Sequence, residues 1–407
     1  MTAPDTRAPI KILLLENVHP SAVQLLNEEG FQVEHLKGSL GTDELQRRIA
    51  DVDVIGIRSK TQLRAADIAA ATRLKAIGCF CIGTNQVDLG HANHAGVPVF
   101  NAPYSNTRSV AELVISEVIA LSRQLMDRSS EVHRGVWRKS ADNCHEVRGK
   151  TIGIVGYGHI GSQVGVLAEA FGMRVVFYDI KTKLPLGNNR PVPTLDALLE
   201  QSDFVTLHVP ETPDTRDMIR APELARMREG ASLLNLSRGT VVDIPALADA
   251  IRGRHIGGAA VDVYPEEPEK NSDGFASALC GLPNVILTPH VGGSTEEAQE
   301  SIGREVATSL TKFVKGGATT GAVNFPQVEL PPSAGTHRLL NIHRNVPGVL
   351  RDINRIVSDV NANIERQVLA TDPHIGYLLM DINADVSAEV EERVNGLSAS
   401  IRTRVLF

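Results

Sequence analysis

The chain has 407 residues, of which 42% are hydrophobic and 22% are charged, and its formal net charge is -7. This composition is that of a globular protein with enough apolar side chains for two or three domains. The sequence contains no dense run of Lys and Arg, no apolar stretch of the roughly 18 residues that span a bilayer, and no apolar signal-peptide core in its polar lead, residues 1–9. We therefore expect a cytosolic protein without nucleic-acid or membrane partners.

Cysteine usage gives no indication of a metal site. The four cysteines are Cys79, Cys81, Cys144 and Cys280. Their spacing differs from that of zinc ligands, and the first two lie in an apolar run. We expect reduced thiols with structural roles and no bound metal.

The first part of the chain alternates short β-like runs with amphipathic segments, which is typical of an α/β domain. These segments are 11–16, 21–29, 52–57 and 74–82. No glycine fingerprint occurs among them. An extended run, 97–103, is followed by a long predicted helix over 109–133, which we interpret as the hinge into a second domain.

A glycine-rich run, Val155-Gly156-Tyr157-Gly158-His159-Ile160-Gly161, follows a β-rich segment, 151–155. Apolar residues repeat at helical spacing behind it, so strand, glycine turn and helix come in the order that a dinucleotide site requires. Gly156 permits the tight turn, Gly158 lets the backbone approach a pyrophosphate, and Gly161 lets the helix pack on the strand. The helix N-terminus attracts the anion. For an isolated glycine match, an ordinary loop is the alternative.

Asp179 ends the next predicted strand, 174–179. Its carboxylate can accept hydrogen bonds from a ribose diol and would repel a 2′-phosphate. With strand, helix and acid in register, the pattern predicts a site for NAD and favours NAD over NADP.

Further apolar runs indicate buried parallel strands of a doubly wound sheet. They are 204–210, 232–236, 258–263 and 285–289. A helix predicted over 296–314 follows the last of them and can return the chain to the first domain. The cofactor domain would then be inserted into a discontinuous first domain.

The amino-acid composition changes in the last part of the chain. A Gly- and Pro-rich stretch, 316–335, is interpreted as a linker. Beyond it the predicted order is βαββαβ, which is the ferredoxin-like arrangement. The predicted segments are strand 338–343, helix 347–360, strands 364–370 and 375–383, helix 387–397 and strand 401–407.

The loop that enters the first of these helices carries polar side chains in the run 341–350. Pro347 suits a first helical turn, and His and Asn beside a helix N-terminus can hold a small zwitterion by its carboxylate. A capping and turn segment without a ligand is the alternative.

Three polar residues follow three late strands, where an open α/β sheet presents its ligand crevice. Arg238 offers a planar fork for a substrate carboxylate. His290, oriented by Glu267, can pass a proton to or from an alcohol while hydride moves to a nicotinamide ring. Taken singly, each residue has an ordinary explanation as a surface Arg, a loop Glu and a strand-terminal His.

Four motifs resemble those of the D-isomer-specific 2-hydroxyacid dehydrogenases: 155–161, Ser-Arg-Gly-Thr-Val-Val-Asp at 237–243, the stretch 262–267, and Thr-Pro-His-Val-Gly-Gly-Ser at 288–294. The resemblance covers essentially the whole chain. It implies that Arg238 holds the substrate carboxylate, that His290 is the proton donor or acceptor, and that Glu267 pairs with His290. It also implies NAD contacts, with Asp262 near the nicotinamide carboxamide. Beside the loop glycines, these contacts are His159, Ile160, Asp179, Leu236, Ser237, Arg238, Asp262, His290, Val291, Gly292 and Gly293.

The resemblance completes the expected architecture as α/β, with two doubly wound (Rossmann/flavodoxin-like) parallel-sheet domains and a C-terminal ferredoxin-like ACT domain. We expect the substrate-binding domain in 1–108, the NAD-binding Rossmann domain in 109–295, a return segment and linker in 296–335, and the regulatory ACT domain in 336–407.

The resemblance also suggests how the substrate is chosen. Arg58, Ser59 and Lys60 end the strand 52–57 at the position that faces a substrate phosphate, although a solvent-exposed basic pair is the alternative. Trp137 and Lys139 lie in a loop that would cross a dimer interface toward the partner's active site, although a single Trp is more often part of a core.

Regulation is implied for the ACT domain. His343 and Asn345 of one subunit, with Asn363 of its neighbour, match positions that bind the feedback inhibitor L-serine across paired ACT domains. Pairing of this kind would cover an exposed sheet edge. A homotetramer is expected from the family.

The activity that the resemblance implies is NAD-dependent oxidation of D-3-phosphoglycerate to 3-phosphohydroxypyruvate, the first step of L-serine synthesis, with 2-oxoglutarate reduction as a secondary activity. An enzyme for glycerate, hydroxypyruvate or D-lactate is the alternative within the same chemistry. A NAD-sensing protein similar to transcriptional corepressors is the alternative of another class.

Overall fold

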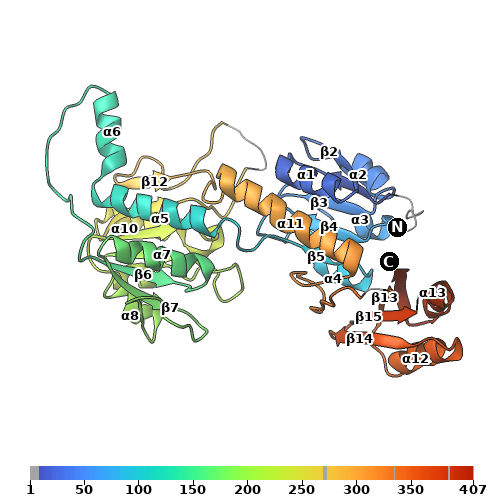
Figure 1. Ribbon diagram of the computed structural model, residues 1–407. Helices are drawn as coiled ribbons and strands as arrows, with labels where there is room; N and C mark the ends of the chain where they lie inside the picture. The colour runs from blue at the N-terminus through green and yellow to red at the C-terminus, as the bar shows by residue number, and fades with distance from the viewer. Residues whose placement is uncertain (1–8, 269–272, 334, 384–385, 407) are drawn as a thin grey trace. The chain divides into compact units, whose positions relative to one another are not determined.

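The computed structural model describes residues 9–268, 273–333, 335–383 and 386–406 (Figure 1). The chain forms two compact units. One unit contains Met1–Ser105 and Gln299–Phe407, and the other contains Asn106–Ala298. Nearly all of the polar lead discussed above lies outside the described residues.

The first unit begins with a five-stranded parallel sheet in the order β2-β1-β3-β4-β5. Its central strands are short and fully buried, as expected of strands that helices cover on both faces. The strands are β1 (Lys11–Leu14), β2 (Gln32–His35), β3 (Val54–Ile57), β4 (Ala76–Cys79) and β5 (Val99–Phe100). The helices between them are α1 (Pro20–Glu28), α2 (Thr42–Ile49), α3 (Ala65–Ala70) and α4 (Leu89–His94).

Two of these elements have little sequence signal. Strand β2 lies at the sheet edge and is mostly polar, with side chains that are exposed or half-buried. Helix α2 buries only Leu45 and Ile49. Two apolar positions in eight residues are too few to establish a helical period.

Helix α11 (Glu296–Gly316) carries the chain back to the first unit (Figure 1). Its side chains Val306, Leu310 and Phe313 belong to the same apolar core as Ile12 and Phe100 of the parallel sheet. Gly78 of β4 permits this packing, because an added Cβ would lie 2.9 Å from both Val306 and Leu310.

The stretch interpreted above as a linker belongs to the first unit, and its described residues, 316–333 and 335, include buried side chains. Phe325 and Val328 are buried in its core. The Asn324 side chain accepts a hydrogen bond from the backbone of Val99 (2.8 Å) and donates one to the carbonyl of Val97 (3.0 Å). The stretch that the sequence predicts as a linker therefore packs on the core of the first unit.

The end of the chain forms a four-stranded antiparallel sheet in the order β14-β15-β13-β16, which is the predicted ferredoxin-like βαββαβ arrangement. A buried ion pair joins its two central strands: Arg338 donates to both carboxylate oxygens of Asp381, at 2.7 and 2.9 Å. The strands are β13 (Thr336–Arg344), β14 (Ile364–Thr371), β15 (Ile375–Asn383) and β16 (Ser400–Val405). The helices are α12 (Val349–Asp359) and α13 (Ser387–Asn395).

Helix α12 begins two residues later than predicted. Its N-cap is Gly348, which has a left-handed backbone with φ of 94°. Pro347 therefore precedes the helix and does not occupy its first turn.

The second unit is built on a seven-stranded parallel sheet in the order β12-β11-β10-β9-β6-β7-β8. The strand order reverses between β6 and β9, and such a switch point is where doubly wound sheets bind ligands. The strands are β6 (Thr151–Val155), β7 (Arg174–Tyr178), β8 (Arg190–Pro191), β9 (Phe204–Leu207), β10 (Ala231–Asn235), β11 (Ile256–Val261) and β12 (Val285–Leu287). The α-helices are α5 (Thr107–Ser122), α6 (Leu125–His133), α7 (His159–Ala170), α8 (Leu195–Leu199), α9 (Ala221–Arg226) and α10 (Ile244–Arg252).

The single helix predicted over 109–133 is wrong, because the segment is two helices. Helix α5 ends at Ser122, and Gln124 has a left-handed backbone with φ of 50° before α6 starts. Every side chain of α6 is at least partly exposed, and Figure 1 shows this helix turned away from α5. No side chain of α6 is buried, so the apolar packing of the segment ends with α5.

Among the helices that the structure describes, none has the length and apolarity required to traverse a lipid bilayer.

Candidate active site

The glycine loop between β6 and α7 has the geometry that its sequence predicts. Gly156 has φ of 90°, and an added Cβ would lie 2.3 Å from the carbonyl oxygen of His208. An added Cβ on Gly161 would lie 2.1 Å from the Gly156 carbonyl oxygen, so helix and loop are in close contact. At Gly158 the same test finds open space among the described residues. A phosphate can therefore approach the backbone where α7 begins.

Asp179 lies beside this loop at the end of β7. Its carboxylate accepts a hydrogen bond from the backbone N–H of Tyr157 (2.9 Å) and another from that of Lys181 (2.8 Å). Both bonds hold the acid at the nucleotide end of the sheet. Tyr157 itself packs into the core, where its ring stacks on Phe177 at 3.7 Å.

These features fit a bound NAD. The open glycine position and the N-terminus of α7 suit its pyrophosphate, and Asp179 suits the adenosine ribose. When bound, NAD supplies a hydride acceptor, and the residues described next supply binding and proton transfer.

His290 and Glu267 form the hydrogen-bonded pair that the sequence predicts. The His290 Nδ1 lies 2.8 Å from Glu267 Oε2, and both side chains remain partly exposed, 53% and 36%. This hydrogen bond is the main cause that raises the pKa of His290, against the opposing effect of burial. Burial by itself raises the pKa of Glu267, but the hydrogen bond from His290 and one from the Tyr264 backbone lower it overall. The pair thus keeps the carboxylate charged and the imidazole basic.

Arg238 lies close to this pair. Its guanidinium charge is among the causes that lower the pKa of both Glu267 and His290. The backbone explains the proximity, because a Cβ on Gly239 would lie 2.0 Å from the backbone of Tyr264, whose N–H donates to Glu267 Oε1 (3.1 Å). The structure therefore gathers the three predicted catalytic residues at one end of the sheet.

The turn before Arg238 is held internally. Ser237 donates from both its N–H (3.1 Å) and its hydroxyl (2.8 Å) to Asn235 Oδ1, and Leu236 is buried. Side chains that are engaged in this way leave the backbone as the part of 236–237 that can contact a cofactor.

Asp262 is a buried anchor for the His290 loop. Its Oδ1 accepts hydrogen bonds from the Thr288 hydroxyl (2.6 Å) and the Val291 N–H (2.8 Å), and its Oδ2 accepts one from the Gly292 N–H (2.8 Å). His290 has a left-handed backbone with φ of 54°, which is uncommon for a residue other than glycine. The three bonds to Asp262 help to hold that conformation.

Glu117 of α5 is a buried acid that the sequence analysis missed. Its side chain is 3% exposed, and neither carboxyl oxygen has a hydrogen-bond partner among the described residues. Burial, with a smaller contribution from Asp262, raises the pKa of Glu117 to about 8. At neutral pH this pKa favours a neutral carboxylic acid, within electrostatic reach of Asp262. One Glu within the apolar face of α5 is the signal that could have identified it.

Arg58, Ser59 and Lys60 follow β3 in the first unit. The carboxylate of Glu16 organises this turn, because it accepts hydrogen bonds from the backbone N–H groups of Arg58 (3.3 Å), Lys60 (2.9 Å) and Thr61 (2.8 Å). Glu16 is buried and was also missed by the sequence analysis. Because the Glu16 carboxylate binds backbone N–H groups, the cationic side chains of Arg58 and Lys60 remain available for an anion.

Trp137 is 84% exposed, so the alternative of a core tryptophan is wrong. Lys139 in the same loop is also exposed. Exposed apolar side chains continue from this loop onto α6, at Leu125, Met126, Val132, Val136 and Trp137. A surface of this kind is typical of a protein interface.

The predicted effector residues lie in the antiparallel sheet. His343 is buried in β13, where its Nδ1 lies 2.8 Å from Asn341 Oδ1 and its Nε2 would be 2.2 Å from a Cβ on Gly376. Burial lowers its pKa. Asn345 is exposed and donates to the Asp372 carbonyl (2.7 Å), and Asn363 is exposed beside the start of β14. Asn345 and Asn363 can therefore contact an effector in this conformation, whereas His343 is covered.

Comparison with known proteins agrees with this arrangement. Residues 115–292 match the family described as "D-isomer specific 2-hydroxyacid dehydrogenase, NAD binding domain", and residues 339–401 match the "AHAS small subunit-like ACT domain". The chain is 55% identical over 407 residues to D-3-phosphoglycerate dehydrogenase of Dictyostelium discoideum, covering 99% of this chain and 100% of the relative. It is 52% identical over 401 residues to the enzyme of that name from Escherichia coli K12, covering 98% of both chains.

This chain belongs to the D-isomer-specific 2-hydroxyacid dehydrogenases. Solved structures show the same fold. D-lactate dehydrogenase from Aquifex aeolicus, complexed with NAD and lactic acid, has a TM-score of 0.68 at 26% identity, over 78% of this chain and all of that one. The TT0316 protein of Thermus thermophilus has a TM-score of 0.70 at 31% identity, over 77% and 100%. The prediction of NAD as the cofactor is confirmed by the family match.

Asp179 provides a direct test of cofactor choice. Asp179→Ala should weaken NAD binding by about tenfold or more, because a charged hydrogen-bond acceptor is lost, and should weaken discrimination against NADP. Titration calorimetry with NAD and NADP measures both effects. Asp196→Ala, an exposed change on α8, is the control. Unchanged affinities in Asp179→Ala would contradict the assignment.

Proposed function

We propose that this enzyme oxidises D-3-phosphoglycerate to 3-phosphohydroxypyruvate with NAD, which is the first step of L-serine synthesis. The observation that carries the proposal is the His290–Glu267 hydrogen bond within electrostatic reach of Arg238, at one end of an NAD-binding sheet. Identity of 52–55% along the full length of relatives named D-3-phosphoglycerate dehydrogenase supports the choice of substrate.

Each residue has one role in this proposal. Arg238 binds the substrate carboxylate through its planar guanidinium. His290 accepts the proton of the hydroxyl group on carbon 2 of the substrate, and the hydrogen on that carbon is transferred to NAD as a hydride. Glu267 orients the imidazole and stabilises the imidazolium that forms. Reduction of the keto acid uses the same residues in reverse, with protonated His290 as the acid.

We assign the parts of the chain accordingly. Residues 1–108 and 296–335 form the substrate-binding domain and its return segment, 109–295 the NAD-binding domain, and 336–407 the regulatory ACT domain. Arg58, Ser59 and Lys60 bind the substrate phosphate. The cationic turn also suits a second carboxylate, which makes 2-oxoglutarate reduction a secondary activity. The cytosolic location stays a prediction from the sequence.

We assign the exposed apolar surface of α6 and the Trp137 loop to an interface between subunits. Trp137 and Lys139 would then reach the active site of the partner. The edge strand β14 of the antiparallel sheet offers a second contact, and two such contacts are consistent with a homotetramer.

The test of the phosphate assignment is Arg58→Ala. We expect KM for D-3-phosphoglycerate to rise by about tenfold to a hundredfold, because one charged contact is lost, while turnover of D-glycerate is unaffected. Steady-state NAD reduction with both substrates measures the difference, and Arg47→Ala on α2 is the matched control. Equal rates with the phosphorylated substrate in both proteins would overturn phosphate recognition. No turnover of either substrate by the unsubstituted chain would favour a NAD-sensing protein.

The pH dependence follows from the raised pKa of His290. Oxidation requires a neutral imidazole, so the rate falls as pH drops through this pKa, which lies above the usual 6.5. Glu267→Gln removes the carboxylate that raises it. We therefore expect the acid limb of kcat/KM to move to lower pH and the maximum to fall by about a hundredfold or more. Profiles from about pH 5 to pH 10 measure both. An acid limb that stays in place would contradict the pairing.

L-serine is the proposed feedback inhibitor, bound at paired ACT domains by Asn345 of one subunit and Asn363 of the other. His343, which is covered in this conformation, is the third residue of the proposed site. Asn345→Ala and Asn363→Ala should each weaken serine inhibition by about tenfold with little change in kcat, because both side chains are exposed at the domain surface. NAD reduction titrated with L-serine gives this result. Serine sensitivity that is unchanged in both variants would argue against the site.

A further inference from the structure

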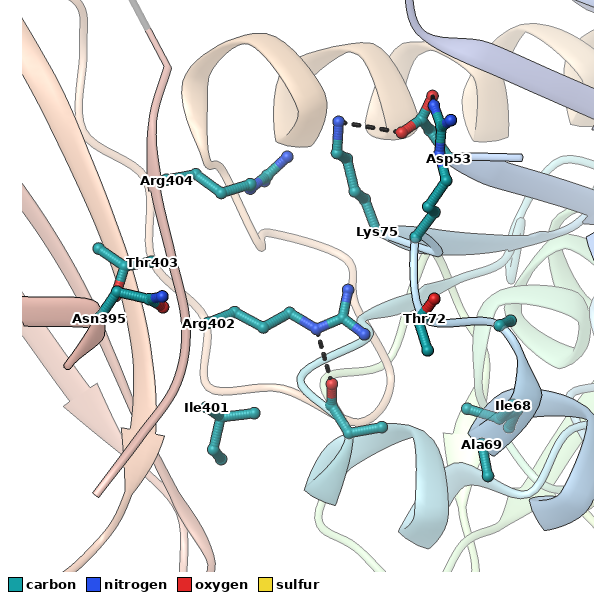
Figure 2. A pocket seen from close by; sticks show the side chains of 13 residues that line it. Asp53, Ile68, Ala69, Thr72, Lys75, Asn395, Ile401, Arg402, Thr403 and Arg404 are labelled. Atoms are coloured by element: carbon teal, nitrogen blue, oxygen red, sulfur yellow. Dashed lines mark hydrogen bonds and ion pairs between the residues drawn. The ribbon is translucent and has the colours of Figure 1, made fainter. Parts of the chain in front are cut away.

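A second group of cations lies in the first unit, where strand β16 of the antiparallel sheet faces the ends of β3 and β4. These elements enclose a pocket of about 700 Å³ (Figure 2). Its charged lining consists of Asp53, Arg73, Lys75, Arg402 and Arg404. In Figure 2 the side chains of Arg402 and Arg404 extend from β16 toward Thr72 and Lys75. Four cations therefore surround one carboxylate.

The one carboxylate is fully engaged. Asp53 accepts a hydrogen bond from the Lys11 backbone N–H (2.9 Å) and forms ion pairs with Arg73 (3.3 Å) and Lys75 (3.1 Å). Arg73 also lies 3.6 Å from the exposed Asp51. The two arginines of β16 are left without a carboxylate partner among the described residues.

Arg402 is held by neutral partners. Its Nε donates to the Ala95 carbonyl at 2.9 Å, and its Nη1 donates to the Leu74 carbonyl. These bonds aim the guanidinium across the pocket and fix its position, but they do not compensate its charge.

Arg404 is the least satisfied side chain of the group. It lies over the Phe313 ring at 5.1 Å, and among the described residues its guanidinium makes no hydrogen bond or ion pair. Its Nη2 is shielded from solvent and has no hydrogen-bond partner there. A guanidinium in this state has a large cost in free energy, which a bound anion would remove.

The pKa shifts of the cations in this pocket are consistent with positive charge that is not fully compensated. Burial and, to a smaller extent, Arg404 lower the pKa of Arg402 to about 10. Burial lowers the pKa of Arg404, although Tyr377, Asp53 and Glu391 act in the opposite direction. Burial also lowers the pKa of Lys75, and Arg404 and Arg73 lower it further against the opposing effect of Asp53. Protonated forms are therefore disfavoured in the pocket as it stands, and an anionic ligand would reverse this effect.

We propose that this pocket binds a phosphate group of a small metabolite. Two arginine forks and a lysine are a donor set that proteins use for phosphate, and the pocket has room for an organic part beside the phosphate. The phosphate would join β16 of the ACT domain to the substrate-binding domain. This binding site is separate from the cationic turn at Arg58, and it does not rest on the proposed reaction.

Titration calorimetry with inorganic pyrophosphate tests the proposal on the full chain. The Arg58→Ala background and saturating NADH exclude binding at the catalytic turn and at the glycine loop. In this background we expect pyrophosphate to bind. Adding Arg404→Gln should weaken the affinity by about tenfold or more, Arg404→Lys should weaken it less, and Arg304→Gln on the exposed face of α11 should leave it unchanged.

Arg73→Gln replaces Arg404→Gln in the test if circular dichroism shows that Arg404→Gln does not fold. Arg73→Gln, whose side chain is 45% exposed, should also weaken pyrophosphate binding. Citrate, which carries carboxylates only, should bind more weakly than pyrophosphate. The proposal is overturned by no pyrophosphate binding in the Arg58→Ala background, by equal affinity in the Arg404, Arg73 and Arg304 variants, or by tighter binding of citrate.

Discussion

The hydrogen bond between His290 and Glu267 is the interaction on which the chemistry of this protein depends. It raises the pKa of the imidazole and fixes which ring nitrogen faces Glu267, so that the other nitrogen is available to a substrate hydroxyl. Much of the surrounding structure maintains it. Asp262 holds the left-handed turn at His290 through three hydrogen bonds, and Gly239 lets the Arg238 turn approach the segment that carries Glu267. The glycine loop that suits the nucleotide follows β6 of the same seven-stranded sheet.

The parts that sequence predicts well are those with a local signal. The glycine run and Asp179 depend on backbone conformation and spacing within one βαβ unit, and the order of the C-terminal elements depends on apolar periodicity. The three catalytic residues could be predicted because each lies in the loop that follows a strand. Their meeting in space required the register of β10, β11 and β12, which the structure supplies.

The parts that sequence predicts poorly depend on contacts between distant segments. Glu16 is a buried acid because three N–H groups of a later turn bind it, and no property of its own neighbours indicates this. The break at Gln124 occurs within a sequence that favours helix, and the packing of 316–335 depends on Asn324 reaching β5. Arg404 lies in a strand of alternating polar residues, and the covering of its guanidinium depends on elements distant in sequence, which its own strand does not indicate.

The most direct test of the central claim is NAD reduction with D-3-phosphoglycerate by the full chain and by His290→Asn, with NAD affinity measured on both proteins. Asparagine retains a polar side chain in the loop but cannot accept the hydroxyl proton. The account predicts a fall in kcat of about a thousandfold or more with NAD affinity unchanged. A variant that retains most of its turnover would contradict the assignment of His290 as the proton acceptor.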